Sequence, residues 1–201
     1  MLITAAEERK KGMTALYIDG EYAVSVDTVT LVSSGFRTGS EITDEELYEL
    51  INASKVSRAK EKALYLIEYR ARSRREIEDK LVPLFGEEAS DKAIERLEQL
   101  GLIDDEAFAV EYARQLFENK HYPGKRVAFE LMKKGIDREL IDEITEELEP
   151  DPAEQIEKLL RTKYSRNMND EKGRQRAING LRAMGFSWYD IKDAMNSYEE
   201  L

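Results

Sequence analysis

Ile77-Glu78-Asp79-Lys80-Leu81 decides the fold, because its two apolar residues recur twice at intervals of fifty residues. Val127 and Leu131 occupy the same positions in the second copy, and Ala177 and Leu181 in the third. Self-similarity at a fixed spacing of this size is typical of a stacked array of one supersecondary unit. The sequence therefore predicts a repeat protein, whose long shared surface suits an elongated partner better than a small substrate.

The same period extends to the third helix of each predicted repeat, where Ile94, Ile144 and Ala194 are also fifty residues apart. Capping residues, glycines and prolines divide each repeat into three short helices. The predicted helices are 57–71, 74–84 and 87–100 in the first repeat, 105–119, 123–134 and 138–148 in the second, and 153–164, 171–184 and 188–198 in the third.

Helix starts carry matching signals. Thr43 and Ser73 each have a glutamate three residues later, the pattern of a capping box. Asp137 and Ser187 each follow an apolar residue that can pack against an isoleucine at the fourth helical position. One turn is expected to differ, because Phe85-Gly86 reverses the order of glycine and apolar residue found in the later repeats.

The first forty residues predict a small antiparallel sheet. Thr14–Ile18 and Tyr22–Val26 flank Asp19-Gly20, a strong hairpin signal, and Thr28–Val32 is a third β-branched run. Three strands with one apolar face need a packing partner, so we expect the sheet to dock on the helices.

The fold class that follows is mainly α. We expect a tandem array of three helix-turn-helix-like three-helix units, elongated and curved, with a small N-terminal antiparallel β element. The predicted divisions are 1–54 for the strands and a capped helix, and 55–104, 105–150 and 151–201 for the three repeats.

Composition excludes several classes of protein. The 201 residues contain no cysteine, so disulfides and thiolate metal sites are excluded. A single histidine, His121, cannot form a metal site alone, so no metal or cofactor is expected. No run approaches the roughly 18 apolar residues of a membrane span, and the start lacks an apolar core of signal-peptide length. A cytoplasmic monomer is expected, with no membrane contact.

Charge follows the repeat, although the whole chain carries −11. The middle helices with their approach segments are basic: 70–82 hold five basic and three acidic groups, 120–134 five and one, and 170–184 four and two. The third helices are acidic: 87–100 hold five acidic and two basic groups, 138–149 six and one, and 187–201 four and one. Units stacked in register would align the basic elements as a stripe. Its expected members are Arg70, Arg72, Arg74, Arg75, Lys125, Arg126, Lys133, Lys134, Lys172, Arg174 and Arg176.

Two interpretations of this charge remain open. Ordinary solvated faces, with cations near helix C-termini, account for Lys133 and Lys134. They do not account for the four arginines of 70–75, which surround a helix N-terminus against its dipole. A bound phosphate or carboxylate would relieve that repulsion, and 122–126 repeats the arrangement.

No enzymatic motif is present. Gly124-Lys125 lacks the upstream glycine of a P-loop, and the carboxylates follow the spacing of solvated helix faces. A helix-turn-helix transcription factor is the main alternative, since a middle helix, a glycine turn and a third helix have suitable lengths. Its groove-reading helix would be acidic, which phosphates would repel. A scaffold protein unrelated to nucleic acid is a further alternative.

Three stretches of the sequence resemble the RecX family. They are Ala63-Leu64 through Ser73–Leu81, Leu100-Gly101-Leu102-Ile103-Asp104-Asp105-Glu106-Ala107-Phe108-Ala109, and Tyr122-Pro123-Gly124-Lys125-Arg126 leading to Leu131–Asp137. The resemblance covers about 57–150 strongly and the third repeat more weakly. The N-terminal strands resemble the extension found in longer members of the family.

The resemblance implies a modulator of the RecA recombinase in homologous recombination, DNA repair and the SOS response. Family members lie in the groove of the RecA filament on single-stranded DNA and hinder its ATPase, strand-exchange and coprotease activities. The basic stripe would then contact RecA carboxylates or DNA phosphates, and the acidic helices would meet basic loops of RecA. Because the chain is acidic overall, single-stranded DNA is expected to bind weakly or through RecA.

Overall fold

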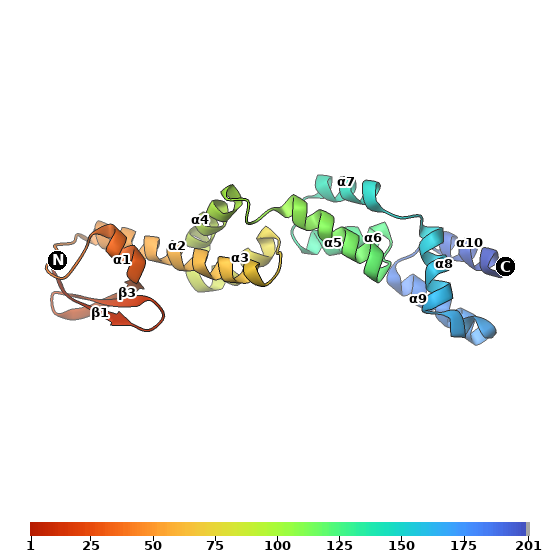
Figure 1. Ribbon diagram of the computed structural model, residues 1–201, viewed down its shortest axis with the longest axis horizontal. Helices are drawn as coiled ribbons and strands as arrows, with labels where there is room; N and C mark the ends of the chain where they lie inside the picture. Colours follow the sequence, from red (N-terminus) through yellow and green to blue (C-terminus); the bar gives the residue numbers. More distant parts are fainter. Residues whose placement is uncertain (200–201) are drawn as a thin grey trace. The chain divides into compact units, whose positions relative to one another are not determined.

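The computed structural model describes residues 1–199, which fold as two compact units that divide after Asp104 (Figure 1). The first unit contains β1 (Ile3–Arg9), β2 (Met13–Ile18), β3 (Glu21–Asp27), α1 (Thr28–Ser34), α2 (Asp44–Tyr69), α3 (Arg74–Phe85) and α4 (Glu87–Gln99). The second contains α5 (Asp105–Lys120), α6 (Gly124–Lys133), α7 (Arg138–Leu148), α8 (Pro152–Thr162), the 3₁₀ helix η1 (Ser165–Asn169), α9 (Glu171–Met184) and α10 (Trp188–Glu199).

The N-terminal element is a three-stranded antiparallel sheet in the order β1-β2-β3, as expected. The prediction of a strand over Thr28–Val32 was wrong, because these residues form helix α1. The Asp27 side chain accepts a hydrogen bond from the Thr30 amide at 2.8 Å and so caps that helix, which overrides the β-branched composition. The third strand of the sheet is instead Ile3–Arg9.

Helix α2 is longer than the sequence predicted. The capping box at Thr43 and Glu46 is present, but the helix continues to Tyr69 without a break at residue 57. The expected division between residues 54 and 55 therefore lies inside α2. The sheet and α1 pack beside the first half of α2, and α3 and α4 beside the second half (Figure 1).

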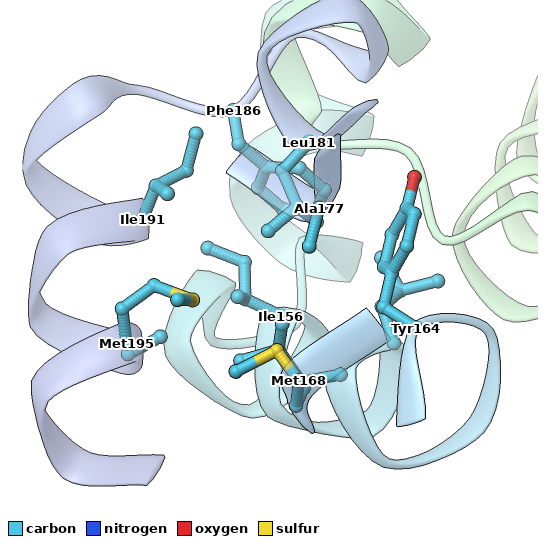
Figure 2. Packing of buried hydrophobic residues seen from close by; sticks show 11 residues of the cluster. Ile156, Tyr164, Met168, Ala177, Leu181, Phe186, Ile191 and Met195 are labelled. Atoms are coloured by element: carbon cyan, nitrogen blue, oxygen red, sulfur yellow. The ribbon is translucent and has the colours of Figure 1, made fainter. Parts of the chain in front are cut away.

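Each three-helix unit has its own core, centred on the residues that repeat every fifty positions. Leu81, Leu131 and Leu181 are each fully buried, in three separate clusters. In the third unit, side chains from α8, η1, α9 and α10 converge around Ala177 and Leu181 (Figure 2). The mainly α architecture with three-helix repeats is confirmed.

The turn between the second and third helices differs in the first unit, as predicted. Gly86 alone separates α3 from α4, with φ 82° and ψ 166°. In the third unit Gly185 adopts the left-handed conformation, and two residues follow it before α10 begins. A positive φ at both glycines explains why each turn needs one.

Helix α9 contains a glycine for a packing reason. A Cβ on Gly180 would collide with the hydroxyl of Tyr164, whose ring stands beside α9 (Figure 2).

The described residues include no helix that combines the length and the apolar character needed to span a bilayer.

Candidate interaction surface on the middle helices

The arginines around the start of α3 already have partners inside the first unit. Ser73 caps the helix by accepting from the Glu76 amide at 3.3 Å. Arg70 donates twice to the Glu76 carboxylate, at 2.8 and 3.0 Å. The Arg72 Nε donates to the carbonyl of Leu66 at 3.1 Å. These contacts close the turn between α2 and α3.

Arg74 joins the basic middle helix to the acidic third helix. Its guanidinium lies 2.7 Å from a Glu98 oxygen and 3.6 Å from an Asp91 oxygen, both on α4. The hydrogen bond that Arg74 donates to the Glu98 carboxylate raises the pKa of Arg74, with smaller contributions from nearby carboxylate charges. Arg75 pairs along its own helix with Asp79 at 3.2 Å. Part of the alternating charge is therefore neutralised within the unit.

The N-terminus of α6 holds an anion that belongs to the protein itself. The Gly124 amide donates to a carboxylate oxygen of Glu149, 25 residues further along the chain, at 2.7 Å. A Cβ at position 124 would collide with that carboxylate in its present position, so a larger residue would displace the Glu149 side chain. The sequence indicated an anion at this helix end, and the structure supplies a carboxylate there.

Helix α6 also presents cations above aromatic rings. The Arg126 guanidinium lies 5.6 Å from the ring centroids of both Tyr122 and Phe129, and the Lys133 ammonium lies 5.5 Å from that of Phe129. Glu130 pairs with Arg126 at 2.8 Å and with Lys133 at 3.2 Å. We call Tyr122, Arg126, Phe129, Glu130 and Lys133 the α6 cluster.

Phe129 is the residue of this cluster that sequence reasoning missed. Phe129 is 48% exposed, and two cations lie over its ring. Arg126, Phe129 and Lys133 follow spacings of three and four residues within α6, so they share one helical face, and Tyr122 lies just before the helix. That spacing was the available signal.

The remaining candidates of the second unit occupy varied environments. The Lys134 ammonium lies 5.5 Å from the ring centroid of Tyr112 on α5. The Arg174 Nε donates to the Met168 carbonyl at 3.3 Å. A Cβ on Gly185 would lie 3.6 Å from the Cβ of Arg126, so the end of α9 approaches the start of α6.

Three candidates are exposed cations without an ion pair to any described residue: Lys125, Lys172 and Arg176. They stand near the starts of α6 and α9. The other candidates described above differ from these three, because Arg70, Arg72, Arg74 and Arg75 bond to groups within the first unit and Arg126 and Lys133 pair with Glu130.

In the described part of the chain, no three His, Cys, Asp or Glu side chains gather in a way that could hold a metal ion. The surface offers cations, an exposed ring and fixed geometry, which suit recognition of a macromolecule.

Comparison with known proteins matches both the first and the second three-helix units. Residues 59–97 match the family model described as "RecX, first three-helix domain", and 104–144 match "RecX, second three-helix domain". Regulatory protein RecX of Bacillus subtilis (strain 168) is 30% identical over 98% of this chain and 77% of its own length. That of Caldanaerobacter subterraneus subsp. tengcongensis is 29% identical over 98% of this chain and 99% of its own.

Solved structures agree with these matches. A crystal structure of regulatory protein RecX aligns with a TM-score of 0.67 at 27% identity, over 96% of this chain and 98% of that one. RecX from Lactobacillus salivarius aligns with a TM-score of 0.63 at 25% identity, over 74% of this chain and 99% of that one. The fold is thus that of known relatives, and the chain belongs to the RecX family of regulatory proteins.

Proposed function

We propose that this protein binds the RecA filament on single-stranded DNA and mainly inhibits its ATPase, strand-exchange and coprotease activities, without being an enzyme itself. The observation that carries the proposal, beside family membership, is the α6 cluster. It combines an exposed aromatic ring with two cations on a folded surface. Aromatic residues and arginine dominate the energetics of protein interfaces, which makes Phe129 and Arg126 the expected anchors.

Ion pairs and ring contacts connect the residues of the α6 cluster in the unbound protein. Glu130 holds both Arg126 and Lys133 beside the Phe129 ring. Binding therefore costs little side-chain entropy at this point, and the affinity per contact is correspondingly greater. Lys125, Lys172 and Arg176 add exposed positive charge, which would speed association with an anionic surface.

RecA protein rather than free DNA is the expected source of affinity. The chain carries −11, and the third helices are acidic, so phosphates are repelled by most of the molecule. Single-stranded DNA would bind weakly, or only through RecA. The acidic helices α4, α7 and α10 would meet basic loops of RecA.

The test is a RecA ATPase assay on single-stranded DNA with this protein titrated in. We expect inhibition by the wild-type protein, and an increase of about tenfold or more in the half-inhibiting concentration for Phe129→Ala. Tyr22→Ala, an exposed aromatic on the sheet, is the matched control and should inhibit normally. Equal inhibition by Phe129→Ala and wild type would remove the α6 cluster from the interface.

Charge is tested separately at the start of α3. Reversal of Arg74 alone would break its pair with Glu98, so the informative variant exchanges both charges, Arg74→Glu with Glu98→Arg. If Arg74 contacts the partner, the exchanged protein folds normally but inhibits less. Normal inhibition would assign Arg74 a structural role only.

A separate measurement tests the alternative function. Tight, sequence-dependent binding of this protein to labelled duplex DNA without RecA would favour a transcription factor over a RecA regulator.

A further inference from the structure

A groove in the first unit lies outside the α6 cluster. It has a volume of about 830 Å³ and is bounded by the β1–β2 turn, α1, α2 and the end of α3. Its walls carry apolar side chains that face solvent: Val29 is 71% exposed, Tyr65 65% and Leu84 62%. Exposed apolar groups gathered in one concave surface are typical of binding sites.

The walls of the groove are fixed by hydrogen bonds between the elements. The Thr28 amide donates to the Gly12 carbonyl at 2.8 Å, which ties α1 to the β1–β2 turn. The Asp27 amide donates to the Ser54 hydroxyl at 2.7 Å, which ties the end of β3 to α2. The groove is therefore formed before any partner arrives, which lowers the entropy cost of binding.

Three cations line the groove. The Arg58 guanidinium lies 5.9 Å from the ring centroid of Phe85, and the Lys62 ammonium lies 5.1 Å from that of Tyr65. Lys11 stands at the β1–β2 turn. Among described residues, none of the three forms an ion pair with a carboxylate.

The acidic groups of the groove do not balance these cations. One carboxylate oxygen of Asp27 accepts bonds from the amide and hydroxyl of Thr30 and from the Ser57 hydroxyl, so it serves the local fold. Glu61 is the one other acidic residue that lines the groove. The lining thus carries excess positive charge beside its apolar walls.

Lys11 has an unusual backbone. Its φ is 62°, in the left-handed region that asparagine and glycine tolerate better than lysine. The positive φ belongs to the tight β1–β2 turn, where Gly12 also has a φ of 67°, so an asparagine at position 11 would fit the backbone at least as well.

We infer that this groove binds an acidic polypeptide segment that carries apolar side chains, on the RecA protomer itself. This step rests on the proposed function. A nucleic acid strand is a poorer occupant, because bases bind by stacking on free ring faces, and a cation lies over one face of each of the Phe85 and Tyr65 rings. The aliphatic walls at Val29 and Leu84 offer a base nothing to stack on.

The experiment measures binding of the full-length protein to a RecA filament on oligo(dT), with bare oligo(dT) in parallel. We expect the double variant Arg58→Glu, Lys62→Glu to raise the Kd for the filament by about tenfold or more. The matched double variant Lys55→Glu, Lys60→Glu lies on the same helix but outside the groove, and should bind as wild type does. Equal Kd values for the groove variant and wild type would overturn the inference.

The variant Lys11→Asn tests the charge of the groove without the risk that the substitution destabilises the fold. This variant removes the charge and relieves the left-handed backbone, so its urea midpoint should not fall, while its Kd for the filament should rise about three- to tenfold. An unchanged Kd would exclude Lys11 from the interface and contradict the inference.

Zero-length cross-linking identifies the occupant directly. Carbodiimide should join Lys11 or Lys62 to a RecA carboxylate, located by mass spectrometry, and filaments without such a cross-link would contradict an acidic segment. If the variant Arg58→Glu, Lys62→Glu lost binding to bare oligo(dT) as well as to the filament, the occupant of the groove would be nucleic acid and the inference would be overturned. Failure of the wild-type protein to bind the filament at all would instead refute the proposed function.

Discussion

Gln155, in the first turn of α8, is 5% exposed, and neither its amide nitrogen nor its oxygen has a hydrogen-bond partner among described residues. A buried amide without partners costs about 1–3 kcal/mol. We therefore expect Gln155→Leu to raise the free energy of unfolding by about that amount in urea denaturation. Gln175→Leu, at an exposed site, should change it by less than about 0.5 kcal/mol. A loss of stability in Gln155→Leu would show that the amide is satisfied.

Glu149 acts as a distant cap for α6. Its carboxylate accepts from the Gly124 amide and lies at the positive end of the helix dipole. Glu149→Ala should lower the free energy of unfolding by about 1 kcal/mol, and Glu149→Gln by less, because the amide oxygen still accepts. The control is Glu147→Ala, on the exposed side of α7. Equal stability of all four proteins in urea would contradict the cap.

At the scale of one element, α2 connects the sheet to the first three-helix core. Leu50 belongs to the cluster of the sheet, and Ala59 and Ala63 belong to that of α3 and α4. Ala53 is exposed between them. Ala53→Pro should cost about 3 kcal/mol or more, because it removes a helix hydrogen bond and clashes with the preceding turn. Ala53→Gly should cost only about 1 kcal/mol. Similar small losses for both variants, measured in urea, would mean that the helix is interrupted near residue 54.

Elements with local signals could be predicted well, and α1 shows the limit. The starts of α3 and α7 follow from Ser73 and Asp137, whose side chains bond amides two or three residues away. Thr28–Val32 has the composition of a strand but follows an equally local cap at Asp27, which competes with that composition. The third strand was therefore placed wrongly.

At the scale of the whole molecule, the chain divides after Asp104. No buried cluster crosses that division: two clusters lie entirely before it and two entirely after it. Fragments 1–104 and 105–201 should each unfold cooperatively in urea when followed by circular dichroism, because each retains complete cores. Loss of cooperative unfolding in either fragment would show that the two units depend on one another for stability.

The sequence by itself determined the three-helix repeat, its buried leucines, most helix starts and the alternation of charge. These features depend on contacts within a few residues or on a regular period, so spacing reveals them. Only the tertiary structure decided what the charges do. Arg74 meets Glu98 from 24 residues away, Gly124 meets Glu149 from 25, and Phe129 lies exposed beneath two cations. Which side chains meet across helices depends on how those helices pack, and spacing along the chain does not contain that information.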